Sequence, residues 1–142
     1  GLGVRQTGQV AAYGIHFDRP NTNPTSFVLF WDRTSTTNFS ANLLYDGSTV
    51  DPTIETFDLR GGNKVVAICG TRITGAAVPC SISNSADIIF RRPDPAANIR
   101  LNTGGGPCVQ CAGIRASVRI SSLGNVDYTV EVRDTGQISV SR

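Results

Sequence analysis

The sequence predicts an all-β protein built from antiparallel sheets. Apolar and polar residues alternate with period two along most of the chain, and no window of about a dozen residues carries the apolar stripe of an amphipathic helix. The 15 glycines and 7 prolines divide the chain into short segments of strand length. Because 142 residues suit one domain, we expect a single globular β domain over residues 1–142.

The first predicted strand carries Tyr13, Ile15 and Phe17 on one face, and Pro20 and Pro24 lie beyond its end. The next strand, Ser26–Asp32, is apolar on both faces. Such strands lie centrally in sheets that are covered on both sides, so something must cover its second face.

The middle of the chain predicts three further strands. Phe39–Tyr45 alternates cleanly, with apolar residues at every odd position, and Asp46–Gly47 then turns the chain. Thr53–Leu59 is a poorer strand ahead of a Gly-rich turn. Lys64–Cys69 is apolar on both faces, like Ser26–Asp32.

The last third begins with the strand Ala86–Arg91, which Pro93 and Pro95 end, and Asn98–Leu101 continues it briefly. From Gly113 to Val140 the alternation is the most regular in the chain. We expect this last segment to form a meander of three strands.

The even or odd numbering of the apolar residues limits the strand register of that meander. Its apolar residues are even-numbered, so we expect them all to face inward: Ile114, Ala116, Val118, Ile120, Val126, Tyr128, Val130, Val132, Ile138 and Val140. Three-residue loops that end in glycine, Ser122–Gly124 and Asp134–Gly136, fit this parity. The first loop sets Arg119 opposite Asp127 and Arg115 opposite Glu131, and the second sets Arg133 opposite Gln137. Opposite charges then neutralise the outward arginines.

Four cysteines, an even number, predict two disulfides and an oxidising compartment. Local closure loses the least chain entropy, which favours Cys69–Cys80 and Cys108–Cys111. A zinc site usually takes two close pairs of cysteines, and only Cys108 and Cys111 are close. A thioredoxin-like site would place its Cys-x-x-Cys at the start of a helix, whereas this pair follows a Gly-rich loop.

The residues indicate neither an enzyme nor a cofactor or metal site. His16 is the only histidine, and its strand face is polar, so we expect a solvated or hydrogen-bonded side chain. The Gly104–Pro107 loop resembles the nucleophile loop of trypsin-like proteases, but glycine stands at the serine position. No phosphate-loop, EF-hand or HExxH pattern occurs.

The basic residues are almost all arginine, with Lys64 the single lysine and a formal net charge of +2, so no polybasic tail is present. The adjacent Arg91 and Arg92 form a candidate contact for an anion or nucleic acid. The alternative is that they pair locally with Asp87 or Asp94.

Several segments, in order and spacing, are similar to the globular domain of GspH/FimT-type pseudopilins and related type IV pilin-like proteins. These segments are Tyr13–Phe17, Phe27–Asp32, Ile88–Pro95, Tyr128–Val132 and Asp134–Val140. The family's prepilin-peptidase glycine and its long apolar N-terminal helix are not among residues 1–142. The resemblance implies that residues 1–8 follow that helix as a linker and that the helix covers one sheet face.

The resemblance further implies a structural subunit, a minor or major pilin of a type IV pilus or a pseudopilin of a type II secretion system. Such a subunit lies in an extracellular or cell-surface filament and is first anchored in the membrane by its helix. Its partners would be other subunits and the inner-membrane assembly machinery. Without the helix, we expect residues 1–142 to be monomeric.

Two other functions remain open. Some members of the family bind DNA for uptake through a C-terminal Gly-Arg-x-Arg motif, but the matching positions here run from Gly136 to Ser139 and lack both arginines. DNA binding through other arginines is the first alternative. A secreted adhesion or sugar-binding β-sandwich is the second.

Overall fold

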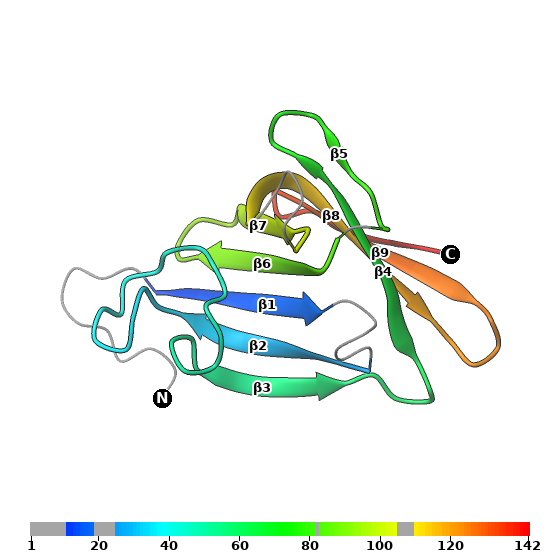
Figure 1. Ribbon diagram of the computed structural model, residues 1–142, viewed down its shortest axis with the longest axis horizontal. Coiled ribbons are helices and arrows are strands. Elements are labelled where there is room, and N and C mark those ends of the chain that lie inside the picture. Colours follow the sequence, from blue (N-terminus) through cyan, green and yellow to red (C-terminus); the bar gives the residue numbers. More distant parts are fainter. Residues whose placement is uncertain (1–10, 19–24, 82, 105–109) are drawn as a thin grey trace.

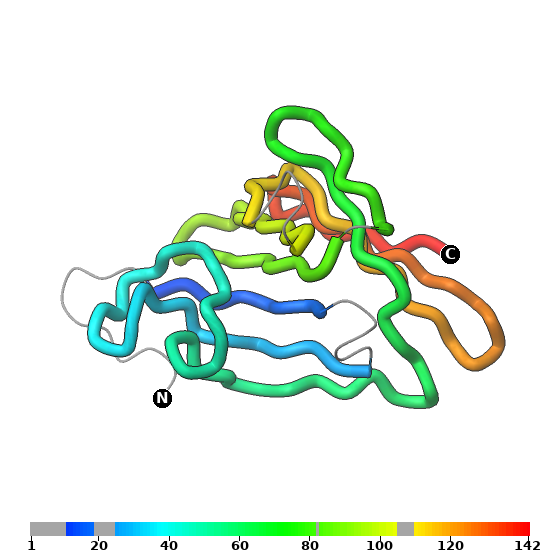
Figure 2. The backbone as a smooth tube through the Cα atoms, in the orientation of Figure 1, coloured from blue at the N-terminus to red at the C-terminus, as the bar shows by residue number. Residues whose placement is uncertain are grey.

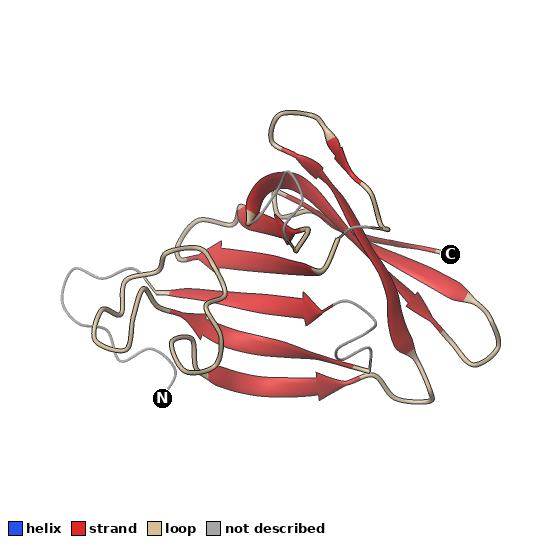
Figure 3. Ribbon diagram, in the orientation of Figure 1, coloured by secondary structure: helices blue, strands red, loops and turns tan. Residues whose placement is uncertain are grey.

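The computed structural model describes residues 11–18, 25–81, 83–104 and 110–142. Every regular element within these ranges is a strand (Figure 3), which confirms the all-β prediction. The same ranges contain no helix long and apolar enough to cross a membrane. The strands are β1 (Ala12–Asp18), β2 (Ser26–Asp32), β3 (Thr53–Asp58), β4 (Lys64–Arg72), β5 (Ala77–Val78), β6 (Ser85–Arg91), β7 (Ala97–Asn102), β8 (Cys111–Ser121), β9 (Asp127–Arg133) and β10 (Ile138–Ser141).

All ten strands belong to one antiparallel sheet that curls on itself (Figure 1). We call the order β3-β2-β1-β6-β7 the N-terminal half-sheet and the order β5-β4-β8-β9-β10 the C-terminal half-sheet. Strand β8 joins them, because Cys111–Gly113 pairs with β7 whereas Gly113–Ser121 pairs with β4. In Figure 2 the backbone of β8 can be followed from its pairing with β7 to its pairing with β4.

The main core lies where the two half-sheets face each other. Ile68 of β4 and Val118 of β8 pack in one cluster with Ile99 and Leu101 of β7, and each of these side chains is at most 2% exposed. Full burial of an aliphatic side chain contributes about 1.5–3 kcal/mol. The curl therefore brings together two apolar faces that would otherwise lie in water.

The predicted strands are present except for one, but Asn98–Leu101 does not continue Ala86–Arg91, because it lies in β7, which runs antiparallel to β6. Ser26–Asp32 is β2 with the same bounds, and Thr53–Leu59 is β3 without its last residue. The strand expected at Phe39–Tyr45 is wrong, because residues 33–52 form a loop in front of the N-terminal half-sheet (Figure 1). Leu43 within it has a φ of 63°, which a strand does not allow.

The alternation of apolar and polar residues in that loop reflects burial of every second side chain rather than pairing with a neighbouring strand. Ala41, Leu43 and Tyr45 pack against a second, small core made of Ala12, Phe30 and Ile89. The backbone N–H groups of Leu43 and Tyr45 have no neighbouring strand and donate to the carboxylates of Asp32 and Asp87 instead. The loop thereby covers one face of β2, the cover that its two apolar faces require.

The β8–β9 register differs from the prediction by two residues. Arg115 lies opposite Arg133, and Arg119 lies opposite Thr129. The loop consists of residues 123–125, and Asn125 rather than Gly124 takes the left-handed conformation, with φ 55°. Asparagine tolerates this conformation better than most residues, so the turn forms one residue later than expected.

The β9–β10 register is as predicted. The backbone N–H of Arg133 donates to the carbonyl of Gln137, and Gly136 has a φ of 87° in the turn between them. The even-numbered side chains share the inner face, but Ile138 and Val140 are 60% and 65% exposed. Their expected burial is wrong, because β10 is the last strand of the sheet and lies beyond the main core.

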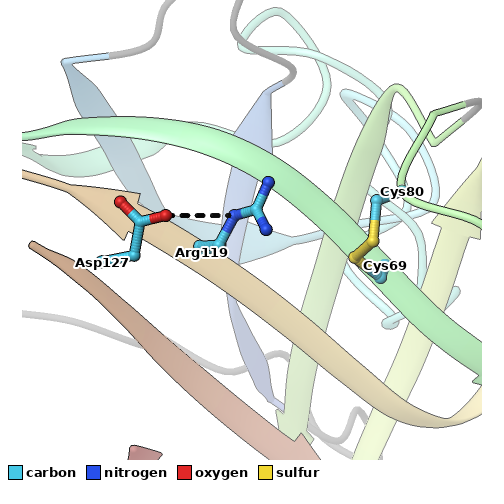
Figure 4. The surroundings of a disulfide bond; sticks show 4 residues. All are labelled: Cys69, Cys80, Arg119 and Asp127. Carbon is cyan, nitrogen blue, oxygen red and sulfur yellow. Dashed lines mark ion pairs between the residues drawn. A yellow bond between two sulfur atoms is a disulfide. The ribbon is translucent and has the colours of Figure 1, made fainter. Parts of the chain in front are cut away.

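The predicted disulfide Cys69–Cys80 is present and ties β4 to the segment after β5 (Figure 4). The two Cα atoms lie 4.3 Å apart, and the cysteines are 11 residues apart in sequence. Of the predicted pair Cys108–Cys111, Cys108 lies outside the described residues.

Replacement of Cys69 and Cys80 together by serine is expected to lower the free energy of unfolding by about 3 kcal/mol, because the unfolded chain regains the entropy of a short closed loop. Urea unfolding under non-reducing conditions measures this change. The Cys108/Cys111 double serine variant removes the second predicted disulfide, which closes a much shorter loop, and is expected to lose less stability. A peptide map that joins Cys69 to Cys108 would contradict the pairing.

Candidate functional site

An apolar groove lies on the back of the N-terminal half-sheet, on the face opposite the 33–52 loop. Its volume is about 360 Å³. It is lined by Tyr13, Gly14, Ile15, Leu29, Ile54, Phe90 and Arg92.

The strand registers explain why these side chains meet. Tyr13 lies opposite Phe90 of β6, and Ile15 lies opposite Leu29 of β2, so alternate residues of three neighbouring strands share one face. Because the spacing along each strand is two residues, every second position adds to the same apolar surface. The result is a continuous apolar strip across the half-sheet.

The C-terminal half-sheet covers only part of this face. Phe17 and Phe90 pack against the main core, whereas Tyr13, Ile15 and Leu29 belong to neither core cluster and are only half-buried. The groove is the part of the face that the described residues leave open. An open apolar surface that neighbouring strands build together marks an interaction site more often than a scattered exposed side chain does.

Further apolar side chains are exposed near the ends of the sheet. Phe57 on β3 is 36% exposed and stacks on Phe27, with ring centroids 5.1 Å apart. On β9 and β10, Tyr128, Ile138 and Val140 share the inner face and are 42%, 60% and 65% exposed. Both outermost strands thus carry apolar groups that the described residues leave partly uncovered.

The structure separates the two arginines that the sequence put forward as one anion contact. Arg91 lies opposite Ala12, on the face that the 33–52 loop covers, whereas Arg92 lies on the groove face. The Arg92 guanidinium carbon is 5.6 Å from the centre of the Tyr13 ring, within the range of a cation–π contact. The two neighbouring arginines therefore do not face the same side of the half-sheet.

The local ion pairs considered for these arginines are not formed among the described residues either. Asp94 accepts a hydrogen bond from the backbone N–H of Ala96, at 2.9 Å. Asp87 is bonded to His16 on the opposite face. Both carboxylates are therefore engaged elsewhere, and Arg92 lies exposed at the rim of the groove.

His16 lies between two aspartates. Its Nδ1 is 2.5 Å from the Asp87 carboxylate and its Nε2 is 2.9 Å from that of Asp18, while the Tyr45 ring lies 4.2 Å away between centroids. Burial by itself lowers the pKa of His16, but the hydrogen bonds and charges of Asp18 and Asp87 outweigh it and raise the pKa to about 9.

His16 is therefore an imidazolium at neutral pH, with both ring nitrogens donating hydrogen bonds. No ring nitrogen remains to accept a proton, so this histidine has the geometry of a structural tie rather than of a general base. The expected hydrogen bonds are present, but the expectation of a polar strand face at the surface is wrong, because the 33–52 loop covers this face and the His16 side chain is only 13% exposed.

Three buried aspartates hold the 33–52 loop in place, a role that the apolar pattern of the sequence does not predict. Asp32 accepts the backbone N–H groups of Asn42 and Leu43, and Asp51 accepts those of Arg33 and Asp46. The third, Asp87, accepts the N–H group of Tyr45 at 3.2 Å. The one sequence signal is that Asp32 directly follows an apolar run, where a buried polar residue needs partners.

Burial raises the pKa of both Asp32 and Asp51, against the opposing effect of their backbone hydrogen bonds, and the pKa of Asp32 rises to about 6. Each carboxylate is fully buried. Their oxygens bind the chain's own amide groups, and the described residues contain no group of three carboxylate, histidine or cysteine side chains suited to a metal ion.

The outer face of the C-terminal half-sheet carries three arginines, and each of them lies near a carboxylate, although two of them share Glu131. Although the register differs from the prediction, long side chains reach diagonally across it. Arg115 lies 3.4 Å and Arg133 lies 3.0 Å from the Glu131 carboxylate, and Arg119 lies 3.8 Å from that of Asp127 (Figure 4). No unopposed basic stripe is formed on this face by these residues.

Comparisons with known proteins found no matching family model, no matching curated protein and no matching solved structure.

Proposed function

We propose that this chain is the globular domain of a GspH/FimT-type pilin or pseudopilin, a structural subunit of a type IV pilus or a type II secretion pseudopilus. The observation that carries the proposal is the open apolar groove between β6, β1 and β2. A domain of this size rarely leaves such a surface uncovered unless something binds there.

In the proposed subunit, an apolar helix N-terminal to the globular domain lies along the groove. Tyr13, Ile15 and Leu29 would contact one side of that helix, and its other side would contact neighbouring subunits. The domain thereby acts as the outward-facing part of a filament whose centre is made of helices. No catalytic step is required of it.

DNA uptake ranks second as a function, because three outward arginines of the C-terminal half-sheet lie close to carboxylates, and Arg91 and Arg92, which have no ion pair among the described residues, lie on opposite faces. Arg115, Arg119 and Arg133 each have a carboxylate within 3.8 Å. A secreted adhesin ranks third, since the proposal for it rests on the β architecture alone.

The test is assembly in the source cells. Filaments sheared from the cell surface are expected to contain the chain, and Ile15→Lys is expected to remove it from them, since a lysine in the groove opposes an apolar helix. Ile73→Lys makes the same change at a site that is 69% exposed in the β4–β5 turn, and assembly should survive it. A thermal unfolding curve for each variant confirms that it is folded.

Absence of the chain from sheared filaments and from secretion pseudopili would contradict the proposal. So would normal assembly of both Ile15→Lys and Leu29→Lys. The gene sequence upstream of Gly1 gives an independent test, because a prepilin leader supports a pilin and a cleavable secretion signal supports a free adhesin.

A further inference from the structure

We propose that Arg92 pairs with a carboxylate on the segment that fills the groove, and that it thereby sets the position of that segment along the sheet. The inference rests on the proposed function, because it takes a helix as the occupant of the groove. It adds the chemistry of that helix, which must carry an acidic side chain where its apolar surface passes Arg92.

The groove contains a single charged residue that could fix the position of a helix along it. Of its seven lining residues, Arg92 is the only charged one, and the others are apolar apart from the tyrosine hydroxyl. An apolar helix alone could slide along such a surface with little change in buried area. One charge at a fixed point opposes sliding, because only one register brings an opposite charge to it.

Arg92 is held in place by Tyr13 and is still available to bind a carboxylate. Its guanidinium lies over the Tyr13 ring, at 5.6 Å from the ring centre. Stacking engages the flat face of the guanidinium and leaves its N–H groups at the edge free to donate to a carboxylate.

The nearby acidic residues do not compete with a partner's carboxylate for Arg92. Asp94, two residues along the chain, is engaged with the backbone N–H of Ala96, and Asp87 with His16 on the other face. The described residues therefore supply no carboxylate to this guanidinium. When a partner fills the groove, the Arg92 guanidinium loses hydrogen bonds to water. A carboxylate on that partner replaces them.

The chain contains its own control. Arg91 is the same residue type, is also exposed and is adjacent in sequence, but it lies on the opposite face of the half-sheet. A change of charge there alters the net charge of the protein by the same amount. Any effect of position 92 that is absent at position 91 therefore comes from the groove.

The experiment uses residues 1–142 and synthetic Leu/Ala-rich helical peptides of about 18 residues, roughly 27 Å long as helices. Each carries one glutamate, glutamine or lysine, placed at successive positions along the apolar face. Titrations followed by NMR give the dissociation constants. Groove residues such as Ile15 should shift on binding.

We expect one glutamate position to bind about fivefold more tightly than its glutamine counterpart, with a preference that falls as salt increases. In Arg92→Glu the order should reverse, so that the lysine peptide binds best at that position. In Arg91→Glu the glutamate preference should remain.

Two results would overturn the inference, and they differ in what they say of the proposed function. Equal binding of all peptides in the groove, unchanged by Arg92→Glu, removes the role of Arg92 but leaves the groove as a helix site. Failure of every peptide to bind there overturns the inference together with the helix site on which it depends.

Discussion

Replacement of Asp87 by alanine is expected to lower the free energy of unfolding by about 3–5 kcal/mol, the usual cost of breaking a buried ion pair by removing one partner. Asp87 is 2% exposed and accepts hydrogen bonds from His16 and from the backbone N–H of Tyr45. Without it, the imidazolium keeps only Asp18, and the Tyr45 amide loses its acceptor. Urea unfolding at pH 7 measures the loss.

Asp18→Ala is the matched control, because it removes the other carboxylate bound to the same imidazole. The Asp18 side chain is 36% exposed, so water replaces much of what it supplies, and we expect a loss of about 1 kcal/mol or less. Equal losses for the two variants would contradict the view that burial makes Asp87 the dominant partner.

The same pair predicts a dependence on pH. The pKa of His16 is raised to about 9 in the folded protein, above its unfolded value of 6.5, so its contribution to stability is complete below pH 6.5 and is lost as the pH rises through 9. Asp32, whose pKa is about 6, has already ionised in this window. In Asp87→Asn the decrease in stability between pH 6.5 and 9.5 should become smaller.

Replacement of Phe30 by alanine is expected to cost about 3–5 kcal/mol, a large part of the stability of a typical domain. The Phe30 side chain is fully buried in the small core beneath the 33–52 loop, together with Ala12 and Ile89. Its removal leaves a cavity and frees the loop side chains that pack on it. Phe57→Ala, at a phenylalanine that is 36% exposed, should cost much less.

A double-mutant cycle with Gly14 tests the packing directly. A Cβ at Gly14 would overlap the Phe30 ring and would lie 2.7 Å from Cγ1 of Ile89, so Gly14→Ala alone should destabilise the protein by about 1–3 kcal/mol. When Phe30 is already alanine, the ring is gone and the same change should cost much less. Additive losses would contradict the close approach of the ring to β1.

The sequence by itself determined the fold class and most of the strands, because the features that define them are local. Strand β2 is bounded as predicted, since an apolar run that ends at a charged residue has few other ways to be buried. The β9–β10 turn was also predictable, since Gly136 is the only glycine between those strands and supplies the positive φ that the turn requires.

The β8–β9 register was not determined in this way. Gly124 and Asn125 are adjacent, and either can occupy the left-handed position of a three-residue loop. A choice between them moves the strands by two residues, which keeps every side chain on its face and so leaves the apolar pattern unchanged. The charged side chains reach their partners in either register, so charge does not decide it.

The conformation of the 33–52 loop and the position of the open groove were decided only by the tertiary structure. The carboxylates of Asp32 and Asp87 come from outside the Phe39–Tyr45 segment and accept N–H groups that a neighbouring strand would otherwise bind. The open part of the sheet face depends on how far β8 carries the C-terminal half-sheet across it. Periodicity along one strand identifies an apolar face, but only the packing of distant strands determines whether that face is covered.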